Sequence, residues 1–505
     1  MKNYPLLRLI IPFTLGMIGA NLFVSYMSTP LLLILCCIVL ALSFFLLKTL
    51  KPQDLTFGIA AMTFSFLVGM TLYTRKHHSM ADSTPQDTTF CQGLLSELPT
   101  PKPHSWALNL QQDDGTHILL YIGKNGKVPE NDSILYASLH IGDTILALTR
   151  HLEGTENGEG EFGAFRKHLF HHGICATAYA TCGQWTFKPG RQHQSLTLFA
   201  KEIQTDLHHI YEDNGLNQEA STIVEAMTIG RKTDIPQKTR NAYEHAGVSH
   251  VLALSGFHVG IIVMFIQAFF LKNVLPLRWQ RVSNLLIIVT LWCYAFMTGM
   301  PPSLIRATLM FTLLLLCQSI FRDNLSSHSC AIAFLVMLCI NPFYLHDIGF
   351  QLSFLSVASI SLFSQQIMAE NPIRNGILHF LQSLLCITAL CTLFTAPLVA
   401  YHFGRIPLLA IASNLILTPF VYLLMFTSIL WWVFLWCVPV HSILTDLLNW
   451  TASTMNTIVE TISSLPYATL KWHPDLLTTL LCYLVLLLLT YRIKNNPKKR
   501  NIHDT

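Results

Sequence analysis

Charged residues are scarce in this sequence. Asp, Glu, Lys and Arg make up 12% of its 505 residues, whereas a soluble globular protein has about 25%. This composition excludes an enzyme of this size that works in water. Apolar runs of 18 or more residues recur from end to end instead, and each is long enough for a helix that crosses a bilayer. The sequence therefore predicts a polytopic α-helical membrane protein.

Signatures of metal and nucleotide chemistry are also absent from the sequence. No Cys-x-x-Cys or His-Glu-x-x-His pattern organises the 22 histidines, and adjacent histidines such as His77-His78 and His208-His209 diverge on a helix or strand. No Gly-x-x-x-x-Gly-Lys-Ser/Thr run occurs, which excludes nucleotide hydrolysis by a P-loop. We therefore expect no metal and no cofactor, and any uphill transport must be driven by another protein.

The cysteines do not form an obvious disulfide framework. Ten of the thirteen lie in apolar runs, where thiols pack as small hydrophobic groups. Cys91, Cys175 and Cys182 lie in a hydrophilic insert. Cys175 and Cys182 could bridge across a hairpin if the insert faces an oxidising compartment, and otherwise both stay free.

The distribution of apolar runs and basic residues divides the chain into four parts. Three apolar runs come first, at about Leu6–Tyr26, Leu31–Leu47 and Leu55–Tyr73. By the positive-inside bias the N-terminus is cytoplasmic, so three crossings carry the insert outside. The predicted parts are an N-terminal three-helix membrane segment (1–76), an extracytoplasmic β-domain with its linker (77–215), a second membrane domain (216–492) and a basic cytoplasmic tail (493–505).

The insert has the short, alternating apolar runs of β-strands, separated by turn residues. Five short strands in one small domain suggest a barrel, and an OB-like barrel is the closest match, with another small β-domain as the alternative. From His77 to Gly215 there are nine Lys and Arg against sixteen Asp and Glu, a net charge of −7, and the rest of the chain carries +11. The expected strands are Cys91–Leu98, Trp106–Gln112, His117–Ile122, Asp143–Leu148 and Cys175–Phe187.

The second membrane domain opens with polar helical pieces at Asn217–Arg231 and Thr239–His245, and eight further apolar runs follow. Together with the first three, these predict about 10–12 spanning helices. Leu408–Val438 has 31 residues, so it is either a long tilted span or a hairpin. The pattern over Leu444–Leu465 is amphipathic and indicates a helix in the membrane interface or along a cavity.

A serine and a histidine stand together in the fourth apolar run. Ser255 and His258 are three residues apart, so a helix would place them on one face, and Gly256 and Gly260 would let another backbone approach closely. The simplest interpretation is a packing histidine. A Ser/His hydrolase is the alternative, but no carboxylate lies nearby in the sequence to orient the histidine.

Three more polar residues stand in or beside apolar runs. Arg306 follows Pro301-Pro302-Ser303 and either reaches the interface or pairs with an anionic partner, because an arginine at a helix centre costs about 2.5–3.5 kcal/mol. Asp347 and Gln351 are four residues apart, which places them on one helix face. A pairing of Arg306 with Asp347 is the hypothesis that we carry forward.

The run from Glu244 to Gly260, Glu-His-Ala-Gly-Val-Ser-His-Val-Leu-Ala-Leu-Ser-Gly-Phe-His-Val-Gly, resembles the signature of the ComEC family of competence proteins. These are inner-membrane channels that import DNA during natural transformation. Further segments are similar to the family in its order, so that the likeness covers about residues 50–465. They are Phe162–Ile174, Ser303–Met310, Asn341–Phe354, and Ala396-Pro397 followed by Phe403-Gly404 and Asn414.

The resemblance implies a channel for single-stranded DNA and no enzyme activity. Many family members carry a metallo-β-lactamase-like domain after the membrane region, whereas this sequence stops soon after its last apolar run and resembles the short form. The implied location is the bacterial inner membrane, with both termini in the cytoplasm. The implied partners are single-stranded DNA, a DNA receptor, a cytoplasmic helicase or ATPase, a single-strand-binding protein, lipid and a second copy of the chain.

The residues that we expect to line or gate the passage are Ser255, Gly256, His258, Gly260, Arg306, Asp347, Gln351 and Asn414. Because the insert is acidic, we expect it to bind DNA only through a local groove, with Trp106 or Tyr121 as the contact. A transporter of another anionic solute or polymer is the alternative function, and an intramembrane enzyme that uses His258 is the third.

Overall fold

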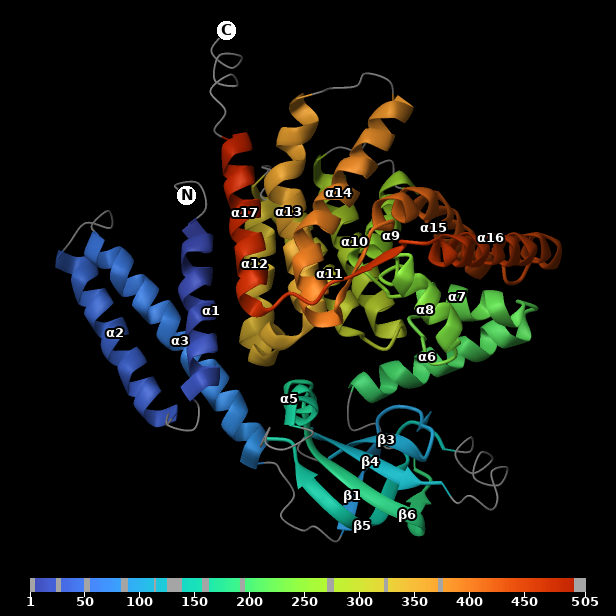
Figure 1. Ribbon diagram of the computed structural model, residues 1–505, viewed down its shortest axis with the longest axis horizontal. Coiled ribbons are helices and arrows are strands. Elements are labelled where there is room, and N and C mark those ends of the chain that lie inside the picture. The colour runs from blue at the N-terminus through green and yellow to red at the C-terminus, as the bar shows by residue number, and fades with distance from the viewer. Residues whose placement is uncertain are drawn as a thin grey trace. The chain divides into compact units, whose positions relative to one another are not determined.

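The structure is a computed structural model of the chain, and its elements are labelled in Figure 1. It describes residues 5–23, 29–49, 55–82, 90–112, 115–124, 139–156, 163–190, 196–269, 277–321, 326–370 and 376–494. The chain forms two compact units. Unit 1 comprises Met1–Glu202 and Ala331–Ile348, and unit 2 comprises Ile203–Cys330 and Gly349–Thr505. The four parts predicted from the sequence state which segments lie in the membrane and which lie on either side of it. This division stays a prediction.

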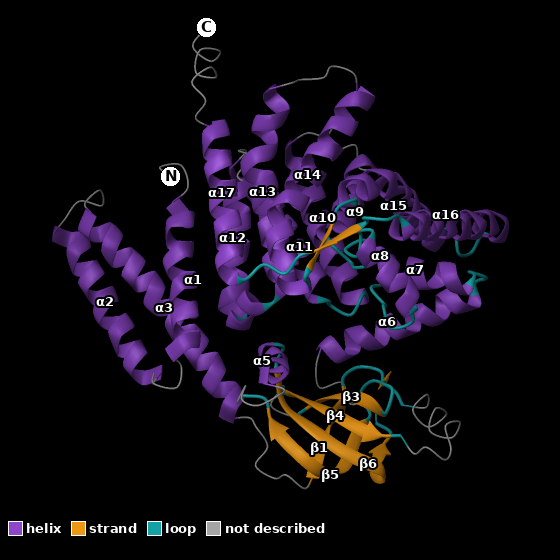
Figure 2. Cartoon of the chain, in the orientation of Figure 1, coloured by secondary structure: helices purple, strands orange, loops and turns teal. Residues whose placement is uncertain are grey.

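Helices predominate, and most strands gather in one small sheet (Figure 2). Before residue 196 the elements are the helices α1 (Pro5–Phe23), α2 (Thr29–Thr49), α3 (Leu55–Asp82) and α5 (Gly163–His171), and the strands β1 (Phe90–Leu95), β2 (Thr100–Pro101), β3 (Ser105–Gln111), β4 (His117–Gly123), β5 (Thr144–Gly154) and β6 (Ile174–Lys188). All five strands expected from the alternating pattern are therefore confirmed.

The later elements, in chain order, are α6 (Leu196–Asp213), α7 (Gln218–Thr228), α8 (Gln237–His245), α9 (Gly256–Phe269), α10 (Leu277–Met297), α11 (Pro302–Phe321), α12 (Ser326–Ile340), the 3-10 helix η2 (Pro342–His346), α13 (Ile348–Glu370), α14 (Gly376–Phe403), β7 (Arg405–Pro407), α15 (Ala410–Val433), α16 (Val438–Ser464), β8 (Thr469–Lys471) and α17 (Leu476–Lys494).

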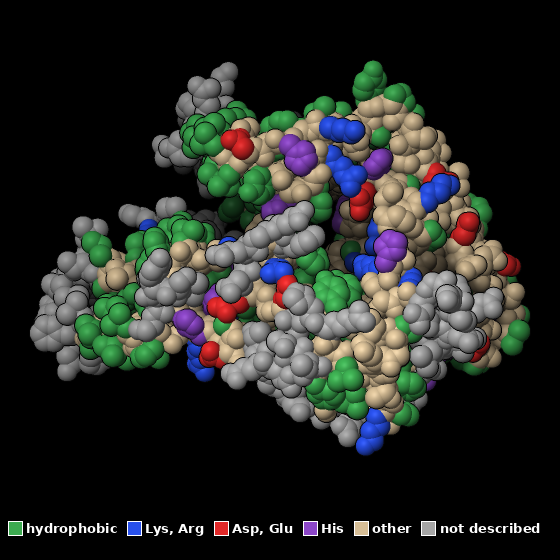
Figure 3. All heavy atoms as spheres, turned by 60° about the horizontal axis from the view of Figure 1, so that its bottom comes forward, with side chains coloured by type: hydrophobic (Ala, Val, Ile, Leu, Met, Phe, Trp, Pro, Cys, Tyr) green, Lys and Arg blue, Asp and Glu red, His purple; other side chains and the backbone are tan. Residues whose placement is uncertain are grey.

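Four of the described helices are long and apolar enough to cross a membrane: Gln280–Met297, Pro302–Ser319, Leu378–Phe403 and Ala410–Val433. Shorter apolar helices of 10–17 residues cover parts of α1, α2, α9, α12, α13 and α17. The chain is therefore a membrane protein, and the expected 10–12 crossings stay a prediction. On the face drawn in Figure 3, hydrophobic and uncharged groups cover most of the described surface, and charged side chains are few.

The apolar run over Leu408–Val438 forms the single helix α15 rather than a hairpin. The next helix, α16, confirms the amphipathic pattern predicted over Leu444–Leu465. Leu448, Met455 and Val459 are buried, whereas Ser453 and Glu460 are exposed. The apolar stripe of α16 therefore packs on the protein.

Unit 2 has one continuous hydrophobic core, contributed mainly by α7, α8, α9, α15 and α16. Trp431 of α15 lies fully buried in it. Its ring stacks on Tyr211 of α6 with 4.9 Å between centroids, and its Nε1 donates to Thr445 Oγ1 of α16 at 2.9 Å. An indole in a core needs such a partner for its N–H.

In unit 1, the small sheet closes on itself through its pairings. Its strand order is β1-β5-β6-β4-β3-β2, and β1 also pairs with β3, so the five long strands form a ring of hydrogen-bonded neighbours. The β4–β6 pair is parallel, and the other pairs are antiparallel. Leu108, Leu120 and Ile145 are fully buried and fill its interior.

The two cysteines considered for a disulfide are both free. Cys175 and Cys182 lie on the same strand, β6, rather than on two strands of a hairpin. Seven residues of extended strand span about 23 Å, which is much farther than the Cα atoms of a disulfide can lie apart.

Glycines let α1 and α3 pack with their backbones in contact. A Cβ atom at Gly16 would overlap the carbonyl of Phe66, and a Cβ at Gly69 would overlap the carbonyl of Phe13. Close van der Waals contact of this kind associates helices in lipid, where the hydrophobic effect gives little drive between them.

We expect Gly69→Val to destabilise the α1–α3 pair by about 1–3 kcal/mol, the usual range for overpacking. Gly58→Val is the matched control, because a Cβ at Gly58 of the same helix meets nothing within 4 Å. Thermal unfolding of the purified protein in detergent measures both variants. Equal melting temperatures for the two variants would contradict the contact.

Candidate functional site

The segment between α8 and α9 begins with a tight turn at Gly247. The Val248 N–H donates to the Tyr243 carbonyl oxygen at 2.9 Å, and the Gly247 N–H donates to the Glu244 carbonyl oxygen at 3.1 Å. Gly247 has a φ of +76°. This is the Schellman end of a helix, in which a glycine takes the left-handed position without strain.

Residues from the region of β7 pack tightly on this turn. A Cβ atom at Gly247 would lie 2.7 Å from the Cβ atoms of both Pro407 and Ala410. Arg405 Nη2 donates to Glu244 Oε2 at 2.6 Å. The end of α8 and the start of α15 are therefore held together at the glycine of the segment.

His250 is exposed, although Val248 and Val251 near it are buried. Its ring forms a hydrogen bond with the Asn414 side chain of α15, and Asn414 Nδ2 donates to the Ala410 carbonyl oxygen at 2.8 Å. His250 therefore lies at the surface of unit 2, where its hydrogen bond with Asn414 joins the segment to α15.

Ser255 immediately precedes α9, which begins at Gly256. Ser255 caps the helix, and its Oγ accepts a hydrogen bond from the Phe257 N–H at 3.3 Å. An oxygen at this position satisfies a backbone donor that the first turn of a helix leaves free. The expected proximity of Ser255 and His258 is confirmed, with Ser255 as the cap of the helix rather than a residue within it.

His258 is completely buried. Its Nδ1 accepts from the Ser255 N–H at 3.3 Å and lies 3.1 Å from Ser255 Oγ. A neutral ring that accepts at Nδ1 carries its proton on Nε2, and Nε2 is buried with no hydrogen-bond partner in the described part of the chain. Within these residues, no carboxylate orients the ring as a catalytic triad would require.

The two glycines of α9 face α11. A Cβ atom would lie 3.7 Å from Ala307 Cβ at Gly256 and 3.7 Å from Phe311 Cζ at Gly260. Arg306 lies beside this contact in α11 and is 5% exposed. Protein therefore encloses its side chain, and the choice between an interfacial position and an anionic partner stays open.

Asp347 and Gln351 lie on either side of the boundary between the units. Asp347 ends η2, where its N–H donates to the Tyr344 carbonyl oxygen at 3.0 Å. Gln351 lies in the first turn of α13, and both side chains are half-buried. The pairing of Arg306 with Asp347 stays a prediction.

Unit 1 contains a histidine cluster that the sequence analysis missed. The rings of His171 in α5 and His346 in η2 stack with 4.1 Å between centroids. The hydroxyl of Tyr73 lies 3.4 Å from His171 Nε2 and 3.3 Å from His346 Nε2, and it donates to Asn21 Oδ1 at 2.7 Å. Adjacent histidines in the sequence gave no sign that residues 175 positions apart would stack.

Burial keeps this pair neutral. Burial lowers the pKa of His171 to about 3, with His346, Lys167, His77 and His172 adding to the effect. Burial also lowers the pKa of His346 to about 4, with Lys167 as the next cause. Among the described residues, no three His, Cys, Asp or Glu side chains are arranged so that they could hold a metal ion.

We expect unit 1 to become less stable as the pH is lowered. The unfolded state binds protons at these histidines below pH 6.5, whereas the folded state binds them only near pH 3–4, so the free energy of unfolding falls between about pH 6.5 and pH 3. Thermal unfolding from pH 7 to pH 4 measures this. The double variant His171→Phe/His346→Phe should show a weaker dependence of melting temperature on pH. His104→Phe, which changes an exposed histidine, is the control and should keep the parent's dependence. The same pH dependence in both variants would contradict the prediction.

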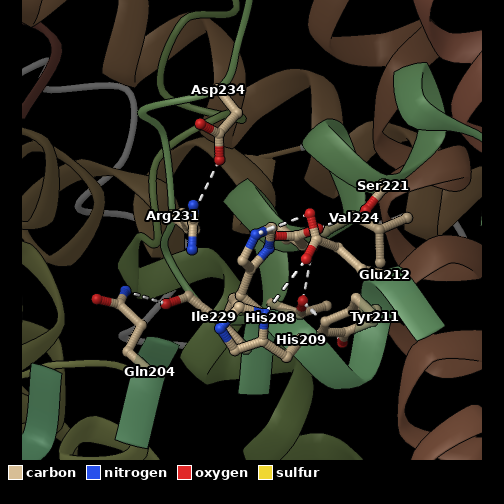
Figure 4. A network of polar contacts seen from close by, with 12 residues as sticks. Gln204, His208, His209, Tyr211, Glu212, Ser221, Val224, Ile229, Arg231 and Asp234 are labelled. Carbon is tan, nitrogen blue, oxygen red and sulfur yellow. Dashed lines mark hydrogen bonds and ion pairs between the residues drawn. The ribbon is translucent and has the colours of Figure 1, made fainter. Parts of the chain in front are cut away.

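A buried polar network binds α6 to α7 (Figure 4). Glu225 of α7 is 3% exposed. Its Oε2 lies 2.6 Å from His208 Nδ1, and its Oε1 accepts from the Ser221 hydroxyl. A buried carboxylate persists only where such partners replace water. His208 and Glu225 are 17 residues apart, and no repeating pattern in the sequence could have predicted that they pair.

The sheet separates the two aromatic residues expected to contact DNA. Trp106 lies opposite Ile122 and Tyr121 opposite Ala107, so the two aromatic side chains point to opposite faces. Trp106 shares the inner face with Leu108, and Lys124 Nζ lies 5.2 Å from its ring centroid.

The outer face carries an aromatic pair instead. Tyr121 stacks on Tyr179 of β6 with 5.2 Å between centroids and 15° between planes. Tyr179 is 47% exposed, and the sequence analysis did not single it out. The parallel register of β4 and β6 places it beside Tyr121.

The fold and the signature segment define a class, namely a helical membrane protein with a small inserted sheet. The family described as "Competence protein" matches residues 227–496, a little over half of the chain. The chain therefore belongs to the competence protein family. The matched region contains the Gly247 turn, His250, the Ser255 cap, His258, Arg306 and Asn414.

Two curated proteins are similar to the chain. "ComE operon protein 3" of Bacillus subtilis (strain 168) is 25% identical over 392 residues, covering 74% of this chain and 46% of the relative. An "Uncharacterized protein" of Aquifex aeolicus (strain VF5) is 28% identical over 225 residues, covering 44% of this chain and 50% of the relative. The chain spans about half the length of these relatives. No solved structure matches it significantly.

We expect Gly247→Ala to destabilise unit 2 more than Gly215→Ala. Both glycines have φ near +80°, so an alanine would cause the same backbone strain at either position. A Cβ at Gly247 would also meet close atoms, whereas a Cβ at Gly215 meets nothing within 4 Å. The difference should be about 1–3 kcal/mol, as for other overpacked sites. Chemical denaturation of the purified variants measures it, and equal losses of stability would show that the turn tolerates a side chain.

Proposed function

We propose that this protein forms an inner-membrane channel that admits single-stranded DNA to the cytoplasm during natural competence. The observation that carries the proposal is the family match over residues 227–496, which contains the signature segment with the exposed His250. The charge of the chain is compatible with an anionic cargo, because the regions outside residues 77–215 carry a net charge of +11.

A channel of this kind must be driven by other proteins. Each inward-moving phosphate works against an inside-negative potential at a cost of about 2.3 kcal/mol per 100 mV. The chain has no P-loop sequence, so we propose that a cytoplasmic helicase or ATPase and a single-strand-binding protein pull the strand. We propose a DNA receptor on the outer side and a multi-pass arrangement with both termini in the cytoplasm.

The structure suggests two kinds of role for the polar residues of the segment. His250 is exposed and hydrogen-bonded to Asn414, so these two side chains can contact a passing strand through hydrogen bonds. Ser255 and His258 are placed to hold the first turn of α9, and Gly256 and Gly260 let α9 lie close to α11. We propose that these residues and Arg306 position or gate the passage rather than form its open wall, and that Asp347 and Gln351 act near the boundary of the units.

We propose that the inserted sheet is an OB-like domain that contacts DNA. OB-folds are five-stranded Greek-key barrels that bind oligonucleotides on one face, and the ring of five long strands supports this comparison. The stacked Tyr121 and Tyr179 on the outer face can receive nucleobases, since a base–aromatic contact contributes about 1–3 kcal/mol for any base. Trp106, on the inner face, is the less suitable contact.

The test follows labelled DNA into cells of a transformable strain whose own copy of this gene is deleted. The parent sequence should restore uptake, whereas His250→Ala should import at least tenfold less label at equal membrane abundance. His209→Ala is the matched control, because His209 is an exposed histidine on α6 outside the family signature. Normal DNA uptake in the deletion strain would overturn the proposal and favour the transporter of another anionic solute.

A further inference from the structure

A cavity of about 400 Å³ lies between the two candidate spans α10 and α11. This volume falls within the range of small-molecule sites in proteins. Its lining residues are Arg281, Asn284, Leu285, Ile288, Leu316 and Ser319. None of these residues belongs to the signature segment between α8 and α9, and the proposed channel assigns no role to the cavity.

The cavity lies at one end of the α10–α11 pair. It starts at Arg281 in the second turn of α10 and reaches Ile288, seven residues deeper, which corresponds to about 10 Å along a helix. On α11 it is lined near the C-terminal end, at Leu316 and Ser319. The positive-inside bias assigns this end, with Arg278 and Arg281, to the cytoplasmic side. The cavity therefore covers the depth from the lipid headgroups to the upper acyl chains.

The inner part of the cavity has a polar group that the protein does not satisfy. Asn284 is 5% exposed, and its Nδ2 donates to Ser319 Oγ at 2.9 Å and to the Leu315 carbonyl oxygen at 3.5 Å. Its Oδ1 is buried and has no hydrogen-bond partner among the described residues. A buried acceptor without a donor costs about 1–3 kcal/mol, so a donor from outside the chain, such as a hydroxyl, would stabilise it.

The outer part has a cation for which the described residues supply no counterion. Arg281 is exposed, and no Asp or Glu of the described residues forms a salt bridge with it. A guanidinium binds phosphate through two parallel hydrogen bonds. Near a bilayer, the phosphates at this depth are those of lipid headgroups, and basic pockets between spanning helices bind anionic ones.

The remaining walls are apolar and open to the lipid. Leu285 is 60% exposed and Leu316 is 41% exposed, and Ile288 is a further apolar lining residue. A free phosphate ion would gain nothing from these walls, whereas an acyl chain would bury apolar surface against them. The cavity therefore matches an amphipathic anion with a phosphate, a hydroxyl and a hydrocarbon chain.

We propose that this cavity binds the phosphoglycerol headgroup and upper acyl chain of an anionic phospholipid. Arg281 holds the phosphate, Asn284 Oδ1 accepts a hydrogen bond from a headgroup hydroxyl, and Leu285, Ile288 and Leu316 contact the chain. The bound lipid holds α10 and α11 together at the end opposite their connection at residues 298–301.

The experiment uses native mass spectrometry of the purified full chain in detergent, titrated with phosphatidylglycerol or phosphatidylcholine. We expect one phosphatidylglycerol to bind at least tenfold more tightly than phosphatidylcholine. Arg281→Gln should abolish this preference. Leu316→Trp keeps the charge but fills the cavity, and it should also lose the bound lipid.

Lys471→Gln is the matched control for charge, because Lys471 is an exposed cation of β8 away from the cavity, and it should bind as the parent does. Glycerol 3-phosphate at the same concentration should not displace the lipid. Equal binding of the two lipids, full preference in Arg281→Gln or Leu316→Trp, or displacement by glycerol 3-phosphate would each overturn the proposal.

Discussion

Many polar groups of this chain are buried away from water, so they have to find partners inside the protein. In hydrocarbon each unsatisfied backbone group costs several kcal/mol, and helices solve this for their own backbone but not for their ends or side chains. The structure shows the local solutions. Ser255 caps α9, Gly247 ends α8 in a closed turn, and Glu225 is bound by His208 and Ser221.

Glycine has a second function that follows from the same constraint. Because the hydrophobic effect contributes little between helices in lipid, contact distance determines how firmly they associate. Gly16 and Gly69 bring α1 and α3 into backbone contact. Gly256 and Gly260 face α11 at ordinary contact distance, and protein encloses His258 and Arg306 beside them.

The places where polar groups stay unsatisfied are the most informative ones. The buried Nε2 of His258 lies in the signature segment, and the buried Oδ1 of Asn284 lies in the cavity between α10 and α11. A buried donor or acceptor without a partner is costly, so such groups point to function or to a bound molecule. The Nε2 of His258 is a polar group in the same segment as the solvent-accessible His250. The Oδ1 of Asn284 can accept a hydrogen bond from the proposed lipid headgroup.

Composition and periodicity determined the class of protein, the five strands of the insert and the amphipathic α16, because these depend on spacing within one element. The run from Gly247 to Gly260 likewise carried the family resemblance. The tertiary structure decided which distant residues meet, including His171 with His346, His208 with Glu225 and Tyr121 with Tyr179. It also decided that Trp106 and Tyr121 lie on opposite faces and that Ser255 precedes its helix. Periodicity carries no information about such pairs, since the register between strands and the exact start of a helix depend on packing against segments far away in the sequence.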